Sequence, residues 1–204
     1  MQLLRIARGS TRCVSLAQLK TNLRVEHTSE DDLMGIWIQA AEEMVESRLN
    51  RSIMKQTFCM TVMSIAPSVM LYRPAVDQLP TITEITTFDG DLTGEINPDD
   101  VRLDIEDMSP LVSFPSISRR RDGRIQIKYE AGQEEAGQVP AAIRQAVILL
   151  ASNWYRSREA APTDPRARAP NAALPFGADA LIASYRIPNI NCEIENLVDY
   201  RRAN

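Results

Sequence analysis

The sequence predicts an α+β fold, in which an antiparallel β-rich insertion interrupts a helical framework and an extended C-terminal tail follows. Apolar residues recur at helical spacing near residues 15–23, 29–50 and 140–160 but alternate between 56 and 130. A chain of 204 residues, 44% of them hydrophobic, is large enough for one ordinary core plus an insertion. We therefore expect an N-terminal helical part at 1–55, the β-rich insertion at 56–130, a C-terminal helical part at 131–186 and a tail at 187–204.

Two helices are expected in the N-terminal part. Ser15 followed by Gln18 fits a capping box at the start of a short helix, and Ser29 is a good N-cap for a longer second helix. Seven residues recur on one side of that second helix: Leu33, Ile36, Trp37, Ala40, Ala41, Met44 and Val45. The opposite side carries Gln39, Glu42, Glu43 and Glu46, so we expect a half-buried helix with its glutamates in water.

The insertion is expected to form short strands joined by hairpins. Residues 57–63 are rich in strand-forming types, and two further segments alternate apolar with polar residues: Val101, Leu103 and Ile105, then Ile125, Ile127 and Tyr129. Asp89-Gly90 and Asp122-Gly123 supply turn residues that tolerate positive φ. The region from about 56 to 130 therefore predicts a compact antiparallel unit.

The third long helix is expected to be the most apolar. Pro140 suits its first turn, and one side carries Ile143, Ala146, Val147, Leu150, Ala151, Trp154 and Tyr155. Ile148 and Leu149 widen this stripe, so the helix needs two sets of neighbours. Arg156 and Arg158 complement the negative end of the helix dipole, and a short helical turn is expected at 178–185.

Composition excludes several function classes. The net charge of −4 argues against a large basic face for nucleic acid. No apolar run approaches the roughly 20 residues of a membrane span, and the start is a poor secretory signal, so we expect a soluble protein made in a cytoplasm, with no membrane partner. Cys13, Cys59 and Cys192 lack the spacing of a disulfide framework or a zinc site.

Few residues suggest catalysis. His27 is the only histidine, which removes Ser-His and Cys-His nucleophile systems, and it is expected in a surface loop. The acidic pairs have polar neighbours and are predicted to be exposed: Asp31-Asp32, Glu42-Glu43, Asp99-Asp100 and Glu134-Glu135. We expect no catalytic, metal-binding or cofactor-binding residue, and no enzyme activity.

Two segments leave other functions open. The stretch from Asp89 to Asp100 resembles an EF-hand calcium loop, although its flanks indicate strands and a hairpin is favoured. A small metal-dependent enzyme using loop 89–100 is thus one alternative. The basic cluster Arg119, Arg120, Arg121 and Arg124 could contact DNA or an acidic partner, and a nucleic-acid-binding regulator is the second alternative. No aromatic residue interleaves this cluster to stack on bases.

Three segments together resemble one protein family. The first is VSLAQLKTNLRVEHTSEDDLMGIWIQAAEEMVESRLNR; the second is RIQIKYEAGQ followed by VPAAIRQAVILLASNWYRSREA; the third is ADALIASYRIPN. In order and spacing they resemble the head-tail connector (adaptor) proteins of long-tailed bacteriophages and gene transfer agents. These are packing signatures, so the resemblance transfers no catalytic residue.

The resemblance implies a location and a set of partners. It implies a dodecameric ring in the virion, between the capsid portal and a stopper or tail-completion protein. Double-stranded DNA would pass through the lumen without sequence-specific binding, and a net acidic protein would let it slide. Helix 140–160 would pack against helix 29–50 within one subunit.

The tail is expected to dock on the portal. Its sequence is too short and too rich in asparagine to fold alone, yet it keeps regularly placed apolar residues. We expect Ile190, Ile194, Leu197 and Val198 to fill a portal groove at helical spacing, with Arg201 and Arg202 at its rim. The alternative is that the tail packs back on its own subunit. The expected portal-docking residues are Tyr185, Arg186, Ile187, Ile190, Ile194, Leu197, Val198, Tyr200, Arg201 and Arg202.

Overall fold

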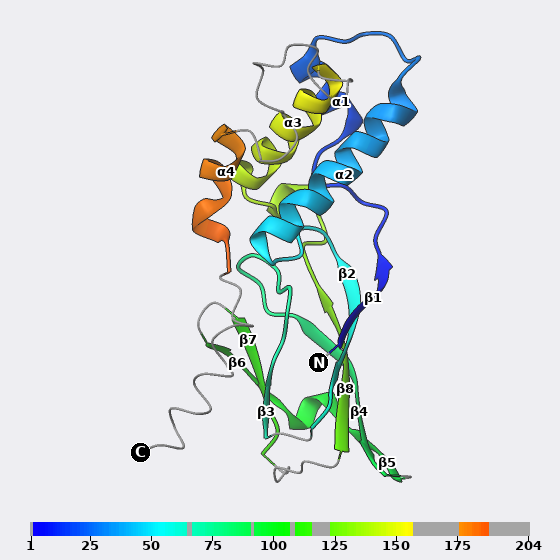
Figure 1. The fold of residues 1–204 in the computed structure, drawn as a ribbon, viewed down its shortest axis with the longest axis vertical. Helices are drawn as coiled ribbons and strands as arrows, with labels where there is room; N and C mark the ends of the chain where they lie inside the picture. Colours follow the sequence, from blue (N-terminus) through cyan, green and yellow to red (C-terminus); the bar gives the residue numbers. More distant parts are fainter. Residues whose placement is uncertain are drawn as a thin grey trace, which may run out of the picture.

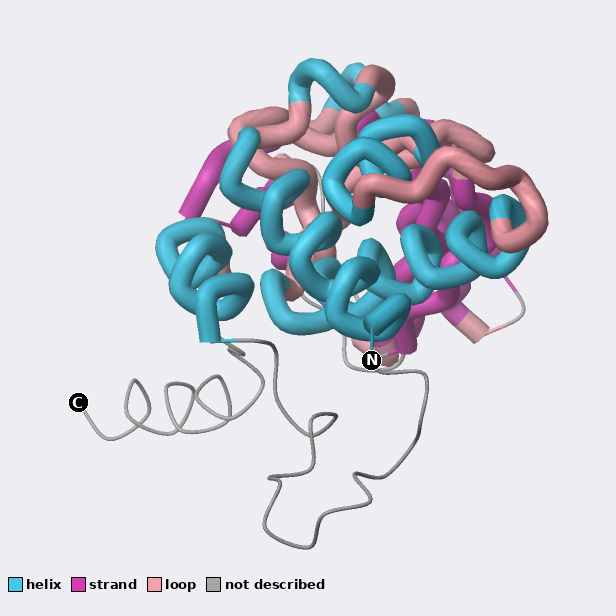
Figure 2. The backbone as a smooth tube through the Cα atoms, turned by 90° about the horizontal axis from the view of Figure 1, so that it is seen from above, coloured by secondary structure: helices cyan, strands magenta, loops and turns pink. Residues whose placement is uncertain are grey.

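The computed structural model places the helices at one end of an elongated molecule and the strands at the other (Figure 1). It describes residues 2–64, 67–90, 92–106, 109–115, 123–156 and 176–187. The helices are α1 (Leu16–Leu23), α2 (Asp31–Leu49), α3 (Ala141–Arg156) and α4 (Phe176–Ile182). Seen from above, they cover the end of the β unit (Figure 2). The predicted α+β class is confirmed.

The helical framework centres on α3, which packs against α2 on one side and α4 on the other. Its predicted stripe is confirmed, with Ile143, Ala146, Val147 and Leu150 buried. Where α2 crosses it, the rings of Trp37 and Tyr155 meet edge to face with centroids 5.7 Å apart. A 3-10 turn at Ala183–Tyr185 follows α4, in agreement with the expected helical turn.

Capping was predicted correctly for α1 and wrongly for α2. The Gln18 amide donates to Ser15 Oγ, and the Ser15 amide donates to Gln18 Oε1, which completes the capping box. By contrast, α2 starts after Glu30, which makes no side-chain cap. Ser29 Oγ instead lies 3.0 Å from His27 Nδ1, so its local hydrogen bond replaces the expected cap.

The buried face of α2 also differs from the prediction. Leu33 and Ile36 were expected inside but are 40% and 63% exposed. Glu42 and Glu46 were expected in water but are fully buried. The apolar residues that face the core are Met34, Ile38, Ala41, Val45 and Leu49. Compared with the predicted orientation, the helix is turned so that its glutamates face the N-terminal strand.

The β unit consists of two antiparallel sheets with a shared core. The larger has the order β1 (Gln2–Arg8), β2 (Gln56–Val62), β8 (Gly123–Ala131), β4 (Thr81–Asp89) and β5 (Leu92–Ile96). The smaller has the order β3 (Ser68–Met70), β7 (Ser109–Ser113) and β6 (Arg102–Glu106). Phe58, Ile127 and Tyr129 of the first sheet pack with Val112 of the second, while Phe114, which directly follows β7, joins the same core.

The predicted strands are confirmed, but β1 was not predicted. It lies within the first 55 residues, yet it pairs along β2 and forms one edge of the larger sheet. Besides the passage from β1 to α1, the chain crosses between the framework and the β unit where Gln56 pairs with Ala131. Gly132 there has φ +109°, and a side chain on it would overlap the Met54 carbonyl, so the junction requires glycine.

No helix in the described ranges has the length and apolar character needed to cross a membrane.

Candidate partner-binding surfaces

A buried ionic cluster fixes β1 to α2. Arg8, the last residue of β1, donates from Nη2 to Glu42 Oε2 and from Nη1 to Glu43 Oε1, each at 2.9 Å. Glu42 Oε1 accepts the Cys13 amide at 2.6 Å, and Arg12 Nη1 lies 3.8 Å from Glu42 Oε2. Two arginines and a backbone amide thus compensate a carboxylate with no exposed surface.

Glu46 extends this cluster one helical turn further along α2. Its Oε1 accepts the Ile53 amide at 3.0 Å and Gln56 Nε2 at 2.5 Å. Its Oε2 lies 3.8 Å from Arg8 Nη1 and has no hydrogen-bond partner among the residues that the structure describes. Burial raises the pKa of this carboxyl, and the nearby arginine opposes the shift only in part. A cavity of about 420 Å³ adjoins it, lined also by Arg5 and Arg73.

The end of α2 fixes the last described residues of the chain. Asn50 ends the helix with φ 55° and donates from Nδ2 to the Ile187 carbonyl at 2.9 Å. The Ile187 amide donates to the Leu49 carbonyl at 3.0 Å. Arg51 donates to the carbonyls of Tyr185 at 2.7 Å and Ala75 at 2.8 Å, and burial lowers the pKa of its guanidinium.

Three of the expected portal-docking residues lie in this part. Tyr185 is half-buried and Arg186 is exposed. Ile187 is 4% exposed, so the subunit's own residues cover its side chain. The other seven lie outside the described residues: Ile190, Ile194, Leu197, Val198, Tyr200, Arg201 and Arg202. Docking stays a prediction for all ten.

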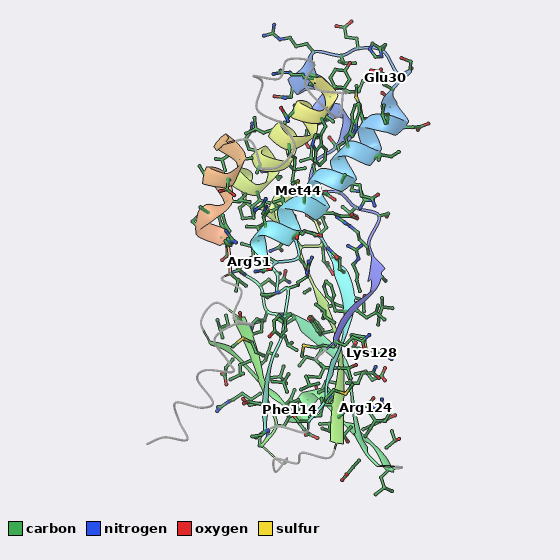
Figure 3. The ribbon with its side chains drawn as sticks, viewed as in Figure 1. Glu30, Met44, Arg51, Phe114, Arg124 and Lys128 are labelled. Carbon is green, nitrogen blue, oxygen red and sulfur yellow. The ribbon has the colours of Figure 1, made fainter. Side chains whose placement is uncertain are left out.

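Of the basic cluster, only Arg124 lies within the described residues. It is exposed on β8, and its guanidinium lies 4.3 Å from the centroid of the Phe88 ring on β4. Figure 3 labels it at the end of the molecule away from the helices. Arg119, Arg120 and Arg121 fall outside the described residues, and contact with DNA or a partner stays a prediction.

The segment 89–100 forms a hairpin and no EF-hand loop. Asp89 pairs with Leu92, Gly90 takes φ 61° in the turn, and β5 occupies the positions where calcium ligands would lie. Asn97 Oδ1 then accepts the Asp99 amide at the start of a 3-10 turn. Among the residues that the structure describes, no three His, Cys, Asp or Glu side chains are grouped to hold a metal ion.

The remaining candidates for chemistry are mostly where the sequence predicted them. His27 is exposed. Cys13 and Cys59 are buried and form no disulfide with another described residue, and burial raises the pKa of the Cys13 thiol. The prediction that Glu42-Glu43 is an exposed pair is wrong for Glu42. The sequence pattern could not reveal the burial of Glu42, because its partner Arg8 lies 34 residues away.

Two apolar surfaces were not predicted from the sequence. On β1, Leu4 and Ile6 are 58% and 51% exposed. Elsewhere, Leu79 and Ile105 border a groove of about 440 Å³, whose lining also includes Arg51, Ala75, Asp77 and Pro110. Ile105 is 67% exposed, although strand alternation predicted it inside. The only sequence signal for either surface is a surplus of aliphatic residues in short strands.

Solved structures with this fold come from gene transfer agent (GTA) particles. A chain from the neck of an empty GTA particle computed with C6 symmetry matches with a TM-score of 0.69 and 23% identity, covering 91% of this chain and 95% of that one. A chain from the virion of a native GTA particle gives 0.70 and 22%, and one from a native GTA neck computed with C12 symmetry gives 0.65 and 22%, with the same coverage. Identities this low show a shared fold.

A family model matches most of the same region. No curated protein sequence matches the chain. The model described as "Head completion protein" matches residues 12–165, a range that begins after β1 and includes α1, α2, the other strands and α3. With the GTA structures, this match confirms the resemblance to head-tail connectors. The chain belongs to the head completion protein family.

Proposed function

We propose that the protein is a structural subunit of a ring at the head–tail junction of a phage or GTA-like virion. The observation that carries this proposal is the extent of the fold match, which includes both the helical framework and the β unit of chains from GTA necks. The C6 and C12 symmetries of those necks favour a ring, and we propose a dodecamer. Family membership favours a structural role over catalysis.

The ring would lie between the portal and a stopper or tail-completion protein. DNA would pass through its lumen without sequence-specific contacts, and the net charge of −4 would limit adhesion of phosphates to the wall. The basic residues Arg119, Arg120, Arg121 and Arg124 would lie at a contact with DNA or a neighbouring protein.

The C-terminal segment would be the arm that reaches the portal. Ile187 is its fixed base, because its backbone and side chain are held at the end of α2. The anchors beyond this base would be Ile190, Ile194, Leu197, Val198 and Tyr200, with Arg201 and Arg202 at the rim of the groove. Ordering such an arm costs free energy, so binding should depend on the few anchors that become buried.

Truncation tests the arm and the assembly together. Ending the chain after Pro188 keeps Ile187 and should leave the melting temperature nearly unchanged, while binding to purified portal, measured by native mass spectrometry, is lost. A second variant, Ile190→Ala with Ile194→Ala, keeps the full chain. It should weaken binding to the portal and leave the melting temperature unchanged. Full-length protein that forms no complex with portal and no ring at micromolar concentration would refute the proposed function.

The two alternative functions make contrasting predictions. A metal-dependent enzyme would need loop 89–100 as its site, and the paired strands β4 and β5 oppose that geometry. A nucleic-acid-binding regulator would bind duplex DNA with an affinity that falls steeply with salt. We propose that the protein has neither activity.

A further inference from the structure

Two edge strands lie on opposite sides of the β unit. Within the described residues, β1 pairs only with β2, and β6 pairs only with β7. Figure 1 shows β1 and β6 on opposite sides of the molecule and at a similar height, whereas β5 lies at the tip. An edge strand leaves a row of backbone donors and acceptors that another chain can pair with.

Each edge is only partly protected. Proteins commonly guard edges with proline, a β-bulge or outward charges. β1 has a register irregularity between Arg5 and Ala7 but contains no proline, and Arg8 is drawn inward by Glu42. β6 carries the exposed charges Arg102 and Asp104. Both edges nevertheless present exposed aliphatic side chains, Leu4 and Ile6 on β1 and Ile105 on β6, and these favour contact with another strand.

The two strands also run in the same direction. β1 ends at Arg8, beside α2. β6 begins at Arg102, which pairs with Ser113 far from the helices, and it reaches the groove beside Arg51 at Ile105. Both strands therefore run toward the helical framework. Rotation about a ring axis along the length of the molecule would preserve this direction, so the two edges would meet as parallel strands.

The exposed side chains of the two edges are alike in being aliphatic. Leu4 and Ile6 on one edge match the groove bordered by Leu79 and Ile105 on the other. Arg5, which lies between Leu4 and Ile6 in the strand, is instead held by Gln56 and Glu43 of its own subunit. A heterologous contact of this kind closes into a ring when repeated around an axis.

We infer that β1 of one subunit adds to β6 of the next copy of this chain, with Leu4 and Ile6 in the neighbour's groove between Leu79 and Ile105. This inference rests on the proposed ring and specifies which strands meet between neighbouring subunits. The groove's other candidate occupant is the C-terminal segment of the same chain, since Arg51 lines the groove and also holds Tyr185.

Disulfide trapping tests the contact. Ile6→Cys combined with Ile105→Cys, in a Cys192→Ser background, should give on oxidation a ladder of covalent oligomers up to the full ring on a non-reducing gel. Each single variant should give no ladder. Met63→Cys with Ile105→Cys is the matched control, because Met63 is 65% exposed but lies outside β1.

A charge variant supplies a second readout. Ile6→Arg should raise the concentration needed for assembly at least about tenfold, with the melting temperature unchanged, while Met63→Arg should assemble normally. A ring that forms without the 6–105 ladder would overturn the edge contact and leave the ring standing. Absence of any ring would refute both. Ile105→Cys alone, with Cys192 retained, would reveal the other occupant as a disulfide within one chain, which would also overturn the inference.

Discussion

The two long helices of the framework bury their inner faces in different ways. α3 places only small and aliphatic residues there, among them Ala146, Val147 and Leu150, and has helices on both sides. α2 buries Glu42 and Glu46 beside its aliphatic residues, against Arg8 from β1. A helix can therefore bury charge at low cost where another segment delivers both a cation and backbone amides. Stability then depends on the partner that delivers them.

The largest effect should come from removing one side of the ion pair on α2. Glu42→Ala leaves Arg8 Nη2 and the Cys13 amide buried without their acceptor, although Arg8 Nη1 keeps its bond to Glu43, and we expect a loss of about 3 to 5 kcal/mol in the free energy of unfolding. Urea denaturation followed by circular dichroism measures it. Glu43→Ala is the control; because the Glu43 side chain is 40% exposed, its loss should stay below about 1 kcal/mol. Equal losses for the two variants would contradict the difference between buried and exposed carboxylates.

An apolar truncation on α3 should cost somewhat less and be independent of pH. Leu150 is 2% exposed, and Leu150→Ala removes its contacts and leaves a cavity, at a cost of about 2 to 5 kcal/mol. The same denaturation measurement at pH 5 and pH 8 should give one value for the difference from wild type. A difference that changed with pH would show that α3 is coupled to the ionic cluster.

The smallest effect concerns the pH dependence that Glu46 gives to α2. Its pKa is raised above the ordinary 4.5 by burial, so the folded protein holds this proton more tightly than the unfolded chain. Its contribution to stability is then full below pH 4.5 and is lost as pH rises through the folded pKa, by at most about 1.4 kcal/mol per pH unit.

Glu46→Gln should remove that slope. The groups that face Glu46 are Arg8 on β1, Glu42 on α2 and Arg73 in the loop before β4, and all remain in the variant. We would measure the free energy of unfolding of wild type and Glu46→Gln by urea denaturation between pH 4 and 8. The difference between the two proteins should change only where pH rises through the folded pKa of Glu46. Parallel curves would mean that Glu46 does not titrate differently on folding.

Local patterns predicted most elements because the signals that define them are local. The capping box at Ser15, the alternation at Ile125 to Tyr129 and the broad stripe of α3 all involve neighbours within a few residues. The orientation of α2 was missed because Arg8, which decides it, comes from a strand 34 residues away. A prediction from helical periodicity places a glutamate in water unless its ion partner is known.

The candidate surfaces were harder to predict than the fold. Docking of Ile187 on another protein stays a prediction, but its contacts with Leu49 and Asn50, about 137 positions earlier, could not be read from the sequence. The exposed edges could not be predicted from single residues either, because Leu4 and Ile105 are of the residue types that are expected in a core. Exposure depends on which strands end up at the edge of each sheet, and that is a property of topology.

The position of Arg8 has a mechanical consequence. It is both the terminal residue of the edge strand and the ion partner of α2, through hydrogen bonds of 2.9 Å. A lateral pull on β1 would therefore reach the helices directly through this short link, and through Arg12 and the Cys13 amide, which also contact α2. The β unit and the framework would then respond to shear as one stiff body.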